Sequence, residues 1–160
     1  MIENIILKYR KLIIIFQNIF IKIEKSLKNL FTMTNNFPRQ IPIFPLSGVI
    51  YFPKTNLPLN IFEERYLDLI NDAIKKNKLM GMVQSKVINQ EVYKVGCLGK
   101  ISDYQKSKDG RVLINLTGLT RFEVLEEVNN SKLYREFTVD YSKFIADINP
   151  IQEDVNTTSL

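Results

Sequence analysis

Histidine and tryptophan are absent from the 160-residue sequence, and cysteine occurs once. A single cysteine excludes a disulfide bond within the chain, and the lack of histidine removes the commonest metal ligand and general base. Zinc sites use several cysteine or histidine ligands, so no zinc site is expected. We therefore predict a protein that is not an enzyme and binds no cofactor or metal. We expect it to function in the cytoplasm, where thiols stay reduced.

The sequence also lacks a complete catalytic or nucleotide-binding motif. Residues 95–101, Val-Gly-Cys-Leu-Gly-Lys-Ile, have two residues between the glycines, whereas a phosphate-binding loop has four and continues with serine or threonine. Cys97 has no histidine to activate it and is predicted to be a buried strand residue. Adjacent serine and lysine residues, such as Ser85 and Lys86, point to opposite faces of a strand and do not form a catalytic dyad.

Positive charge is concentrated at the N-terminus. The formal net charge is +5, and residues 1–34 carry +4 of it from six basic and two acidic residues, which leaves +1 for the rest. Recognition of a phosphate backbone needs clustered lysine and arginine side chains. The charge distribution therefore disfavours nucleic acid as a partner of the remaining residues.

Residues 1–34 form a basic extension with the pattern of an amphipathic helix. Its polar residues recur at spacings of three, four and seven, which leaves one apolar side. The uncharged run from Leu12 to Ile21 spans ten residues, about half the length of a membrane-spanning helix. Three interpretations remain open: a leader ahead of a true start at Met33, a helix that docks on a partner or on the domain, and a helix on a membrane surface. Mass spectrometry of the natural N-terminus tests the first, because an intact Met1 excludes a start at Met33.

A proline-rich stretch, residues 41–66, opens the rest of the chain. It holds four of the six prolines, at positions 42, 45, 53 and 58. Proline fixes its own φ angle, donates no hydrogen bond and pushes the preceding residue towards extended geometry. We expect two short edge-type strands, 41–46 and 57–62, joined by a loop around Ser47-Gly48 and Pro53-Lys54.

One helix and a series of strands follow this stretch. Apolar residues recur on one face from position 63 to 77, with acidic residues at the start and lysines at the end, as the helix macrodipole favours. Asp109-Gly110 predicts a two-residue hairpin turn, while Gly96 and Gly99 predict a bulge or a close backbone approach. The predicted strands are 79–84, 93–104, 111–116, 121–128 and 135–144. This order predicts a mainly β (α+β) fold with one early helix, built as a small closed or half-closed barrel.

Several motifs in this order resemble the N-terminal substrate-binding domain of Lon-type ATP-dependent proteases, across roughly residues 40–145. The resemblance begins in the proline-rich stretch and continues through the glycine-bearing segment 95–101 and the segment 109–122. The residues that carry it, which we expect to be mostly structural, are Pro45, Leu46, Phe52, Pro53, Pro58, Leu59, Arg65, Tyr66, Gly96, Gly99, Gly110, Gly118, Arg121 and Phe122.

The resemblance implies a PUA-like pseudo-barrel of about six short strands that recognises substrates without catalysis. ATP hydrolysis and peptide cleavage belong to other modules of Lon proteases, so a stand-alone Lon-domain protein is the expected match. The family barrel is normally followed by a helical subdomain. We interpret the polar tail, residues 146–160, as a linker to such a subdomain, which a truncated chain would lack. Apolar surface left uncovered in this way favours self-association.

The predicted ligand is an unfolded or peptide-like protein segment, bound by Tyr51 and Phe52 in the loop after the first strand. Neighbouring residues in an extended chain point to opposite sides, so one of the two should face inward and the other should be free to bind. The apolar residues expected to fill the barrel are Leu57, Leu59, Ile61 and Phe62.

Two alternatives concern the partner. PUA-like barrels suggest RNA binding, by analogy of fold alone. The other alternative is a regulatory interaction subunit of a separate protease or ATPase. Membrane contact is expected only through residues 1–34. The basic residues that an RNA-binding patch would use are Lys100, Lys106, Lys108, Arg111 and Arg121.

Overall fold

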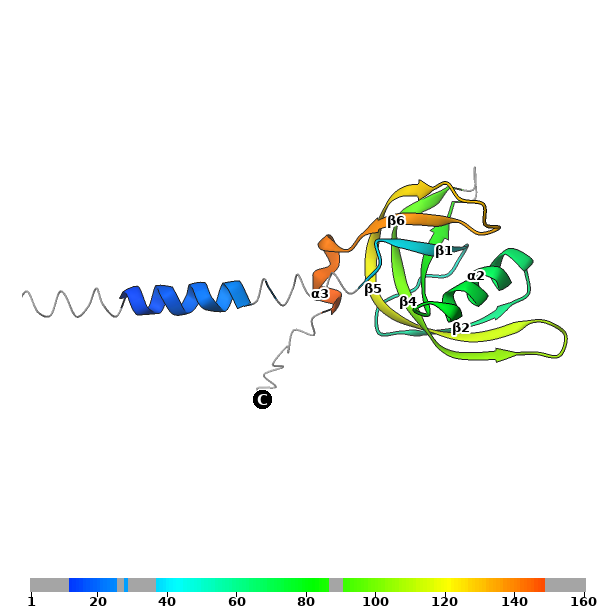
Figure 1. Ribbon diagram of the computed structural model, residues 1–160, viewed down its shortest axis with the longest axis horizontal. Coiled ribbons are helices and arrows are strands. Elements are labelled where there is room, and N and C mark those ends of the chain that lie inside the picture. Colours follow the sequence, from blue (N-terminus) through cyan, green and yellow to red (C-terminus); the bar gives the residue numbers. More distant parts are fainter. Residues whose placement is uncertain (1–11, 26–27, 29–36, 87–90, 149–160) are drawn as a thin grey trace, which may run out of the picture. The chain divides into compact units, whose positions relative to one another are not determined.

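A computed structural model describes residues 12–25, 28, 37–86 and 91–148 (Figure 1). The chain divides into two units, Met1–Phe37 and Pro38–Leu160. In the first unit, residues 12–25 form a helix, as the amphipathic pattern predicts. The predicted start at Met33 and residues 149–160 of the polar tail lie outside the described residues.

The second unit contains six strands and one early helix, which confirms the predicted fold class. A short 3-10 turn, Ser142–Phe144, leads into a last single-turn helix. The elements in chain order are β1 (Gln40–Leu46), β2 (Asn56–Ile61), α2 (Glu64–Lys75), β3 (Leu79–Ser85), β4 (Val92–Lys106), β5 (Val112–Val128), β6 (Glu136–Asp140) and α3 (Ile145–Ile148).

The six strands form one sheet that closes on itself. Their order is β2-β5-β4-β3-β1-β6, and β6 returns to pair with β5, so five strands complete a ring while β2 extends it along β5. The pairing of β1 with β3 is parallel and the other pairings are antiparallel. The hairpin of β4 and β5 reaches past the ring at one end (Figure 1).

Strand β5 joins three neighbours, and its length was not predicted. The sequence pattern predicts separate strands at 111–116 and 121–128, with Gly118 between them. Instead one strand of 17 residues runs through this glycine. Leu98 pairs with Thr120 and the next residue, Gly99, pairs with Gly118, so β5 bulges by one residue here instead of ending. This confirms the irregularity that Gly99 predicts.

The prolines of β1 lie inside the sheet, although an edge strand was predicted. Strand β1 lies between β3 and β6 in the sheet order. Its two halves, however, pair with different neighbours: residues 40–42 with β6 and residues 43–46 with β3. Each proline therefore sits in a half that pairs on one side, where a missing N–H group is tolerated. For β2 the expectation is correct, since it lies at the end of the sheet order.

The β4–β5 hairpin loop and the end of the last predicted strand differ from their predictions. Strands β4 and β5 do form a hairpin, but their last pair is Lys106 with Val112, so the loop holds five residues instead of two. Gly110 has a φ angle of 89° in this loop, which glycine adopts without strain. The predicted strand 135–144 ends early at Asp140, because Ser142–Phe144 turns into a 3-10 helix.

One aromatic ring fills the interior of the barrel. Phe122 is fully buried, and a Cβ atom added to Gly81 or Gly96 would lie 2.9 or 2.5 Å from its Cζ atom. These two glycines leave the space that the ring occupies. The same Cβ on Gly81 would also meet Ile41 and Ile43, so side chains of β1 and β5 meet here over the bare backbone of β3 and β4.

A second apolar layer lies between the sheet and α2. The helix begins with Glu64 and ends with Lys75, and it buries Tyr66, whose ring centroid is 4.1 Å from that of Phe44 in β1. The buried residues of this layer are Phe44, Ile61, Tyr66, Leu69, Ile70, Ala73, Met80, Met82, Ile101, Val112, Ile114, Leu116 and Tyr134.

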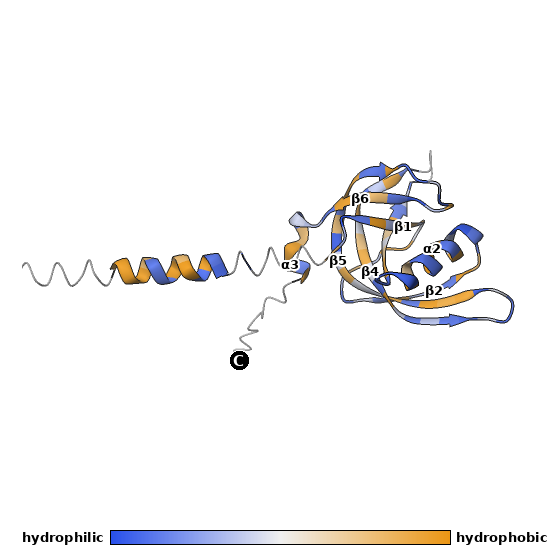
Figure 2. Ribbon diagram, in the orientation of Figure 1, coloured by the Kyte–Doolittle hydropathy of each residue, from blue (hydrophilic) through white to orange (hydrophobic). Residues whose placement is uncertain are grey.

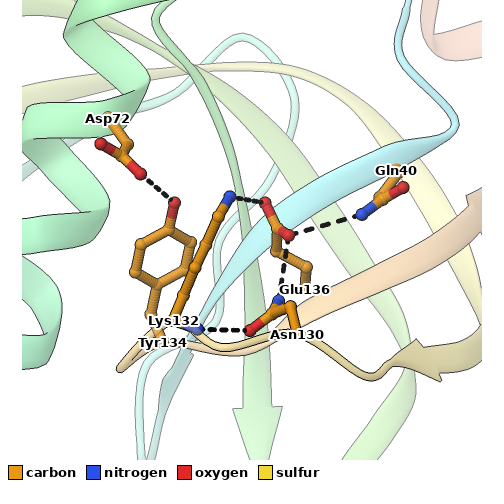
Figure 3. A network of polar contacts seen from close by, with 6 residues as sticks. All are labelled: Gln40, Asp72, Asn130, Lys132, Tyr134 and Glu136. Carbon is orange, nitrogen blue, oxygen red and sulfur yellow. Dashed lines mark hydrogen bonds and ion pairs between the residues drawn. The ribbon is translucent and has the colours of Figure 1, made fainter.

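The loop between β5 and β6 is held by a buried carboxylate (Figure 3). Glu136 is 7% exposed, and its oxygens accept hydrogen bonds from Lys132 Nζ at 2.7 Å, Asn130 Nδ2 at 3.0 Å and Gln40 Nε2 at 3.4 Å. A buried charge is costly unless it is paired and hydrogen-bonded. These contacts meet that requirement and connect the loop to β1.

The same loop is tied to α2 by Tyr134. Its hydroxyl donates a hydrogen bond of 2.7 Å to Asp72 (Figure 3). This bond lowers the pKa of Asp72, because it favours the ionised carboxylate. Helix α2 is therefore fastened to the sheet by polar as well as apolar contacts.

The buried ring makes a testable prediction about stability. We expect Phe122→Ala to lower the free energy of unfolding by about 3 to 5 kcal/mol. The substitution leaves a cavity, and the neighbouring Gly81 and Gly96 have no side chains that could move into it. Urea unfolding measures the loss. The matched control is Phe62→Ala, which changes a ring that is 67% exposed and should cost less than about 0.5 kcal/mol. Similar losses in both variants would contradict this description of the core.

Candidate functional site

A groove of about 410 Å³ lies between the loop after β1 and the strands β3 and β4. Four large apolar residues on its walls are exposed: Ile50, Phe52, Tyr93 and Val95. Exposed apolar residues that gather in this way mark interaction sites more often than single ones do. The full set of lining residues is Val49, Ile50, Tyr51, Phe52, Met82, Val83, Gln84, Tyr93, Lys94, Val95, Gly96, Cys97 and Arg121.

Tyr51 and Phe52 differ in exposure, as expected for neighbours in an extended segment. Tyr51 packs against the second apolar layer, and its hydroxyl donates a hydrogen bond of 2.9 Å to the carbonyl of Leu116. Burial raises the pKa of its phenol, so the hydroxyl keeps its proton. Phe52 is 55% exposed. Of the two candidates, Phe52 is therefore the residue whose ring is free to contact a ligand.

The loop that carries Phe52 is fixed to β5 at Gly118. The amide of Lys54 donates to the Gly118 carbonyl at 2.9 Å, and the Gly118 amide donates to the Thr55 carbonyl at 2.8 Å. A Cβ atom at position 118 would collide with the carbonyl oxygen of Phe52. Thr55 Oγ1 donates to this same carbonyl at 2.7 Å. Gly118 thus permits the close approach that positions Phe52.

The floor of the groove is uncharged. Cys97 is 1% exposed, and burial raises its pKa to about 12, so the side chain remains a neutral thiol as predicted. Gly99 lies beneath Tyr51, since an added Cβ would be 2.8 Å from the Tyr51 hydroxyl oxygen. The floor therefore suits an apolar occupant and offers no reactive thiolate.

Arg121 lines the groove and holds α3. Its Nε and Nη2 atoms donate to the two carboxylate oxygens of Asp147 at 2.9 and 2.8 Å, and its backbone amide donates to the same carboxylate at 2.9 Å. The guanidinium also lies 4.8 Å from the ring centre of Phe144. These bonds lower the pKa of Asp147. Arg121 therefore connects the groove to the residues that follow β6.

The basic residues do not act as one patch. Arg111 pairs with Asp109 at 2.8 Å and Arg121 pairs with Asp147. Two of the five cations considered for RNA are thus neutralised within the domain, and RNA binding is not favoured. Among the residues that the structure describes, no group of three Cys, Asp or Glu side chains is placed to hold a metal ion.

Most of the other signature residues support the fold. Leu46 and Leu59 pack against the second apolar layer, and Arg65 pairs with Glu63 while its guanidinium lies 4.5 Å from the ring centre of Tyr66. Pro45 and Pro58 lie in β1 and β2, and Pro53 precedes Lys54, which has a φ angle of 62°.

Some residues of the groove were missed or misplaced by the sequence. Ile50, Tyr93 and Val95 were not predicted, although apolar residues at positions 93, 95 and 97 alternate and indicate one strand face. Phe62 was expected in the barrel and is instead 67% exposed, because Ile61 points inward and the adjacent residue faces the opposite side. Leu57 and Leu59 are partly buried and Ile61 is buried.

The domain is thus a closed barrel with one helix and an apolar groove lined by β3, β4 and the loop after β1. The family model of the ATP-dependent protease La (LON) substrate-binding domain matches residues 40–159. The chain belongs to this family, and this confirms the resemblance that its motifs suggest.

Relatives and solved structures agree with this assignment. A Lon protease of Flavobacterium johnsoniae is 29% identical over 77% of this chain, and one of Dictyoglomus thermophilum is 27% identical over 64% of it. The chain spans only 15% and 14% of these two proteins. A Lon N-terminal domain protein from Xanthomonas campestris is 26% identical, with a TM-score of 0.55 over 64% of this chain and 59% of that one. The N-terminal domain of a Lon protease from the Mycobacterium avium complex, 13% identical with a TM-score of 0.51 over 64% of this chain and 54% of that one, shares the fold.

The hydroxyl of Tyr51 makes a testable prediction about the loop. We expect Tyr51→Phe to lower the free energy of unfolding by about 1 kcal/mol and to speed hydrogen exchange at the Lys54 amide, because the bond to Leu116 is lost. Tyr93→Phe is the matched control, since it also lines the groove but is exposed. Equal exchange rates in the two variants would contradict a fixing role for Tyr51.

The ion pair of Asp147 predicts a dependence of stability on pH. Because its pKa is lower in the folded than in the unfolded protein, its contribution is present at neutral pH and disappears as the pH falls through the lowered value. We expect wild type to be more stable than Asp147→Asn in urea at pH 7, and the difference to shrink towards about pH 3. A difference that stays constant over this range would show that the charge contributes nothing.

Proposed function

We propose that the groove binds apolar side chains of unfolded or peptide-like protein segments, and that Phe52 is its main contact. The observation that carries this proposal is the exposed ring of Phe52, held at the rim of an apolar groove by a hydrogen-bonded loop. Membership in a substrate-binding domain family supports a protein as the ligand.

The groove is large enough to bind single side chains of another protein and too small to bind the surface of a folded one. A volume of about 410 Å³ is at the lower end of the range of ligand pockets and has room for one or two large side chains. Ile50, Tyr93 and Val95 add apolar rim around it. A segment with one aromatic or branched residue would bury that residue here and leave the rest of its backbone outside.

The domain would recognise clients without acting on them chemically. The relatives are whole Lon proteases, and this chain corresponds to about one seventh of their length. We do not carry their ATPase or peptidase activity over to it. In this proposal the chain is a non-catalytic module in the cytoplasm, and a separate protease or ATPase processes the protein that it binds.

Binding of an unfolded test protein examines this function. We expect reduced, carboxymethylated lactalbumin, labelled with a fluorophore, to bind the full chain saturably in an anisotropy titration. Phe52→Ser should weaken binding by about tenfold or more, the effect of losing a central aromatic contact.

Phe62→Ser is the matched control for this experiment. It removes an equally large and even more exposed ring, 67% against 55%, that does not line the groove. It should leave the affinity unchanged. The proposal fails if the test protein does not bind, or if both variants weaken binding to the same degree.

A further inference from the structure

The helix of residues 12–25 presents a large apolar surface. The function proposed for the groove gives this surface no role. At 100° per residue, six of its large apolar side chains fall within an arc of about 120°. These side chains are between 48% and 65% exposed. Figure 2 shows the helix coloured mostly hydrophobic, with hydrophilic positions between. The residues of this apolar arc are Leu12, Ile13, Phe16, Ile19, Phe20 and Ile23.

The opposite side of the helix is polar and basic. Gln17, Asn18, Lys22 and Lys25 fall within an arc of about 140° that does not overlap the apolar arc. Glu24 lies between the two arcs, while Ile14 and Ile21 interrupt the polar one. Lys28 is also helical and falls within the same polar arc. This side therefore carries a clear excess of positive charge.

The length of the helix excludes a transmembrane role for the described segment. Fourteen residues extend about 21 Å, less than the roughly 30 Å of a bilayer core. No helix among the described residues is long and apolar enough to cross a membrane. A short helix with one wide apolar face and one basic face instead has the composition of helices that lie in the membrane interface.

Two other occupants of the apolar arc fit it less well. In a two-helix coiled coil, charged residues flank a narrow apolar seam; here three of the four flanking positions hold Ile13, Ile15 and Phe20, and one holds Lys22. The groove of the barrel, at about 410 Å³, takes one or two large side chains and not the six of the arc. Neither a second copy nor the groove matches the width of this face.

We propose that residues 12–25 form an interfacial helix that binds the surface of an anionic membrane. The apolar arc inserts among the acyl chains, and Lys22 and Lys25 lie over the lipid phosphates. The charge distribution supports this partner, since residues 1–34 carry +4 while the rest of the chain carries +1, and each basic residue near an anionic leaflet adds affinity. The helix would hold a recognition domain at a membrane surface, independently of what the groove binds.

Vesicle sedimentation with the full chain tests this proposal. We expect at least tenfold tighter binding to vesicles of equimolar phosphatidylglycerol and phosphatidylcholine than to phosphatidylcholine alone, with affinity falling as salt is added. Phe16→Ser combined with Phe20→Ser should abolish binding to both. Lys22→Gln combined with Lys25→Gln should weaken binding to the anionic vesicles by about tenfold or more and change binding to the neutral ones little.

Two controls separate membrane binding by the helix from binding through the barrel or a second copy. Phe52→Ser and Phe62→Ser change exposed rings of the barrel and should leave vesicle binding intact, so failure of the groove proposal does not affect this one. Urea unfolding of the barrel should be the same in the helix variants as in wild type. The proposal is overturned if the full chain does not bind anionic vesicles, or if the Phe16 and Phe20 changes leave binding intact. It is also overturned if these changes alter the oligomeric state or the barrel's stability without lipid, because the arc then covers a second copy or the barrel.

Discussion

The barrel depends on the packing of Phe122 against the bare backbone of Gly81 and Gly96. The ring occupies the space that two side chains would fill, and the strands close around it. Because adjacent residues in a strand point to opposite faces, an inward Phe122 directs Arg121 outward. Arg121 then lines the groove and reaches the carboxylate of Asp147. The packing of Phe122 thus contributes both to the core and to the position of one residue of the candidate site.

The groove owes its shape to ordinary structural contacts. Tyr51 is bonded to Leu116, and the Phe52 carbonyl is held by Thr55. The carbonyl lies where Gly118 lacks a side chain. A loop backbone fixed in this way loses little conformational freedom on binding, which favours affinity for a small contact area. The residues that stabilise the loop and the residue that would touch a ligand are therefore different, although they are neighbours in sequence.

The sequence predicted the elements of the fold better than their connections. Prolines 42 and 45 indicated extended, singly paired segments, but only the structure shows that one strand exchanges partners between them. Residues 111–116 and 121–128 were expected to be separate strands, whereas one strand runs through Gly118, whose missing side chain admits a loop from elsewhere in the chain. The same limit applies to the groove: Ile50 and Tyr93 are far apart in sequence, and their proximity follows from strand pairing. Local sequence patterns indicate which backbone conformation a segment prefers. Contacts between segments that are distant in sequence then decide which strands pair and which residues come together.

The bond between Arg121 and Asp147 also holds the last described turn beside the groove. Asp147 lies in that turn, and Arg121 lines the groove. A protein segment attached at that point would meet the groove as part of the same molecule. Its occupancy would depend on tether length through an effective concentration, and a weak contact would suffice to keep it bound.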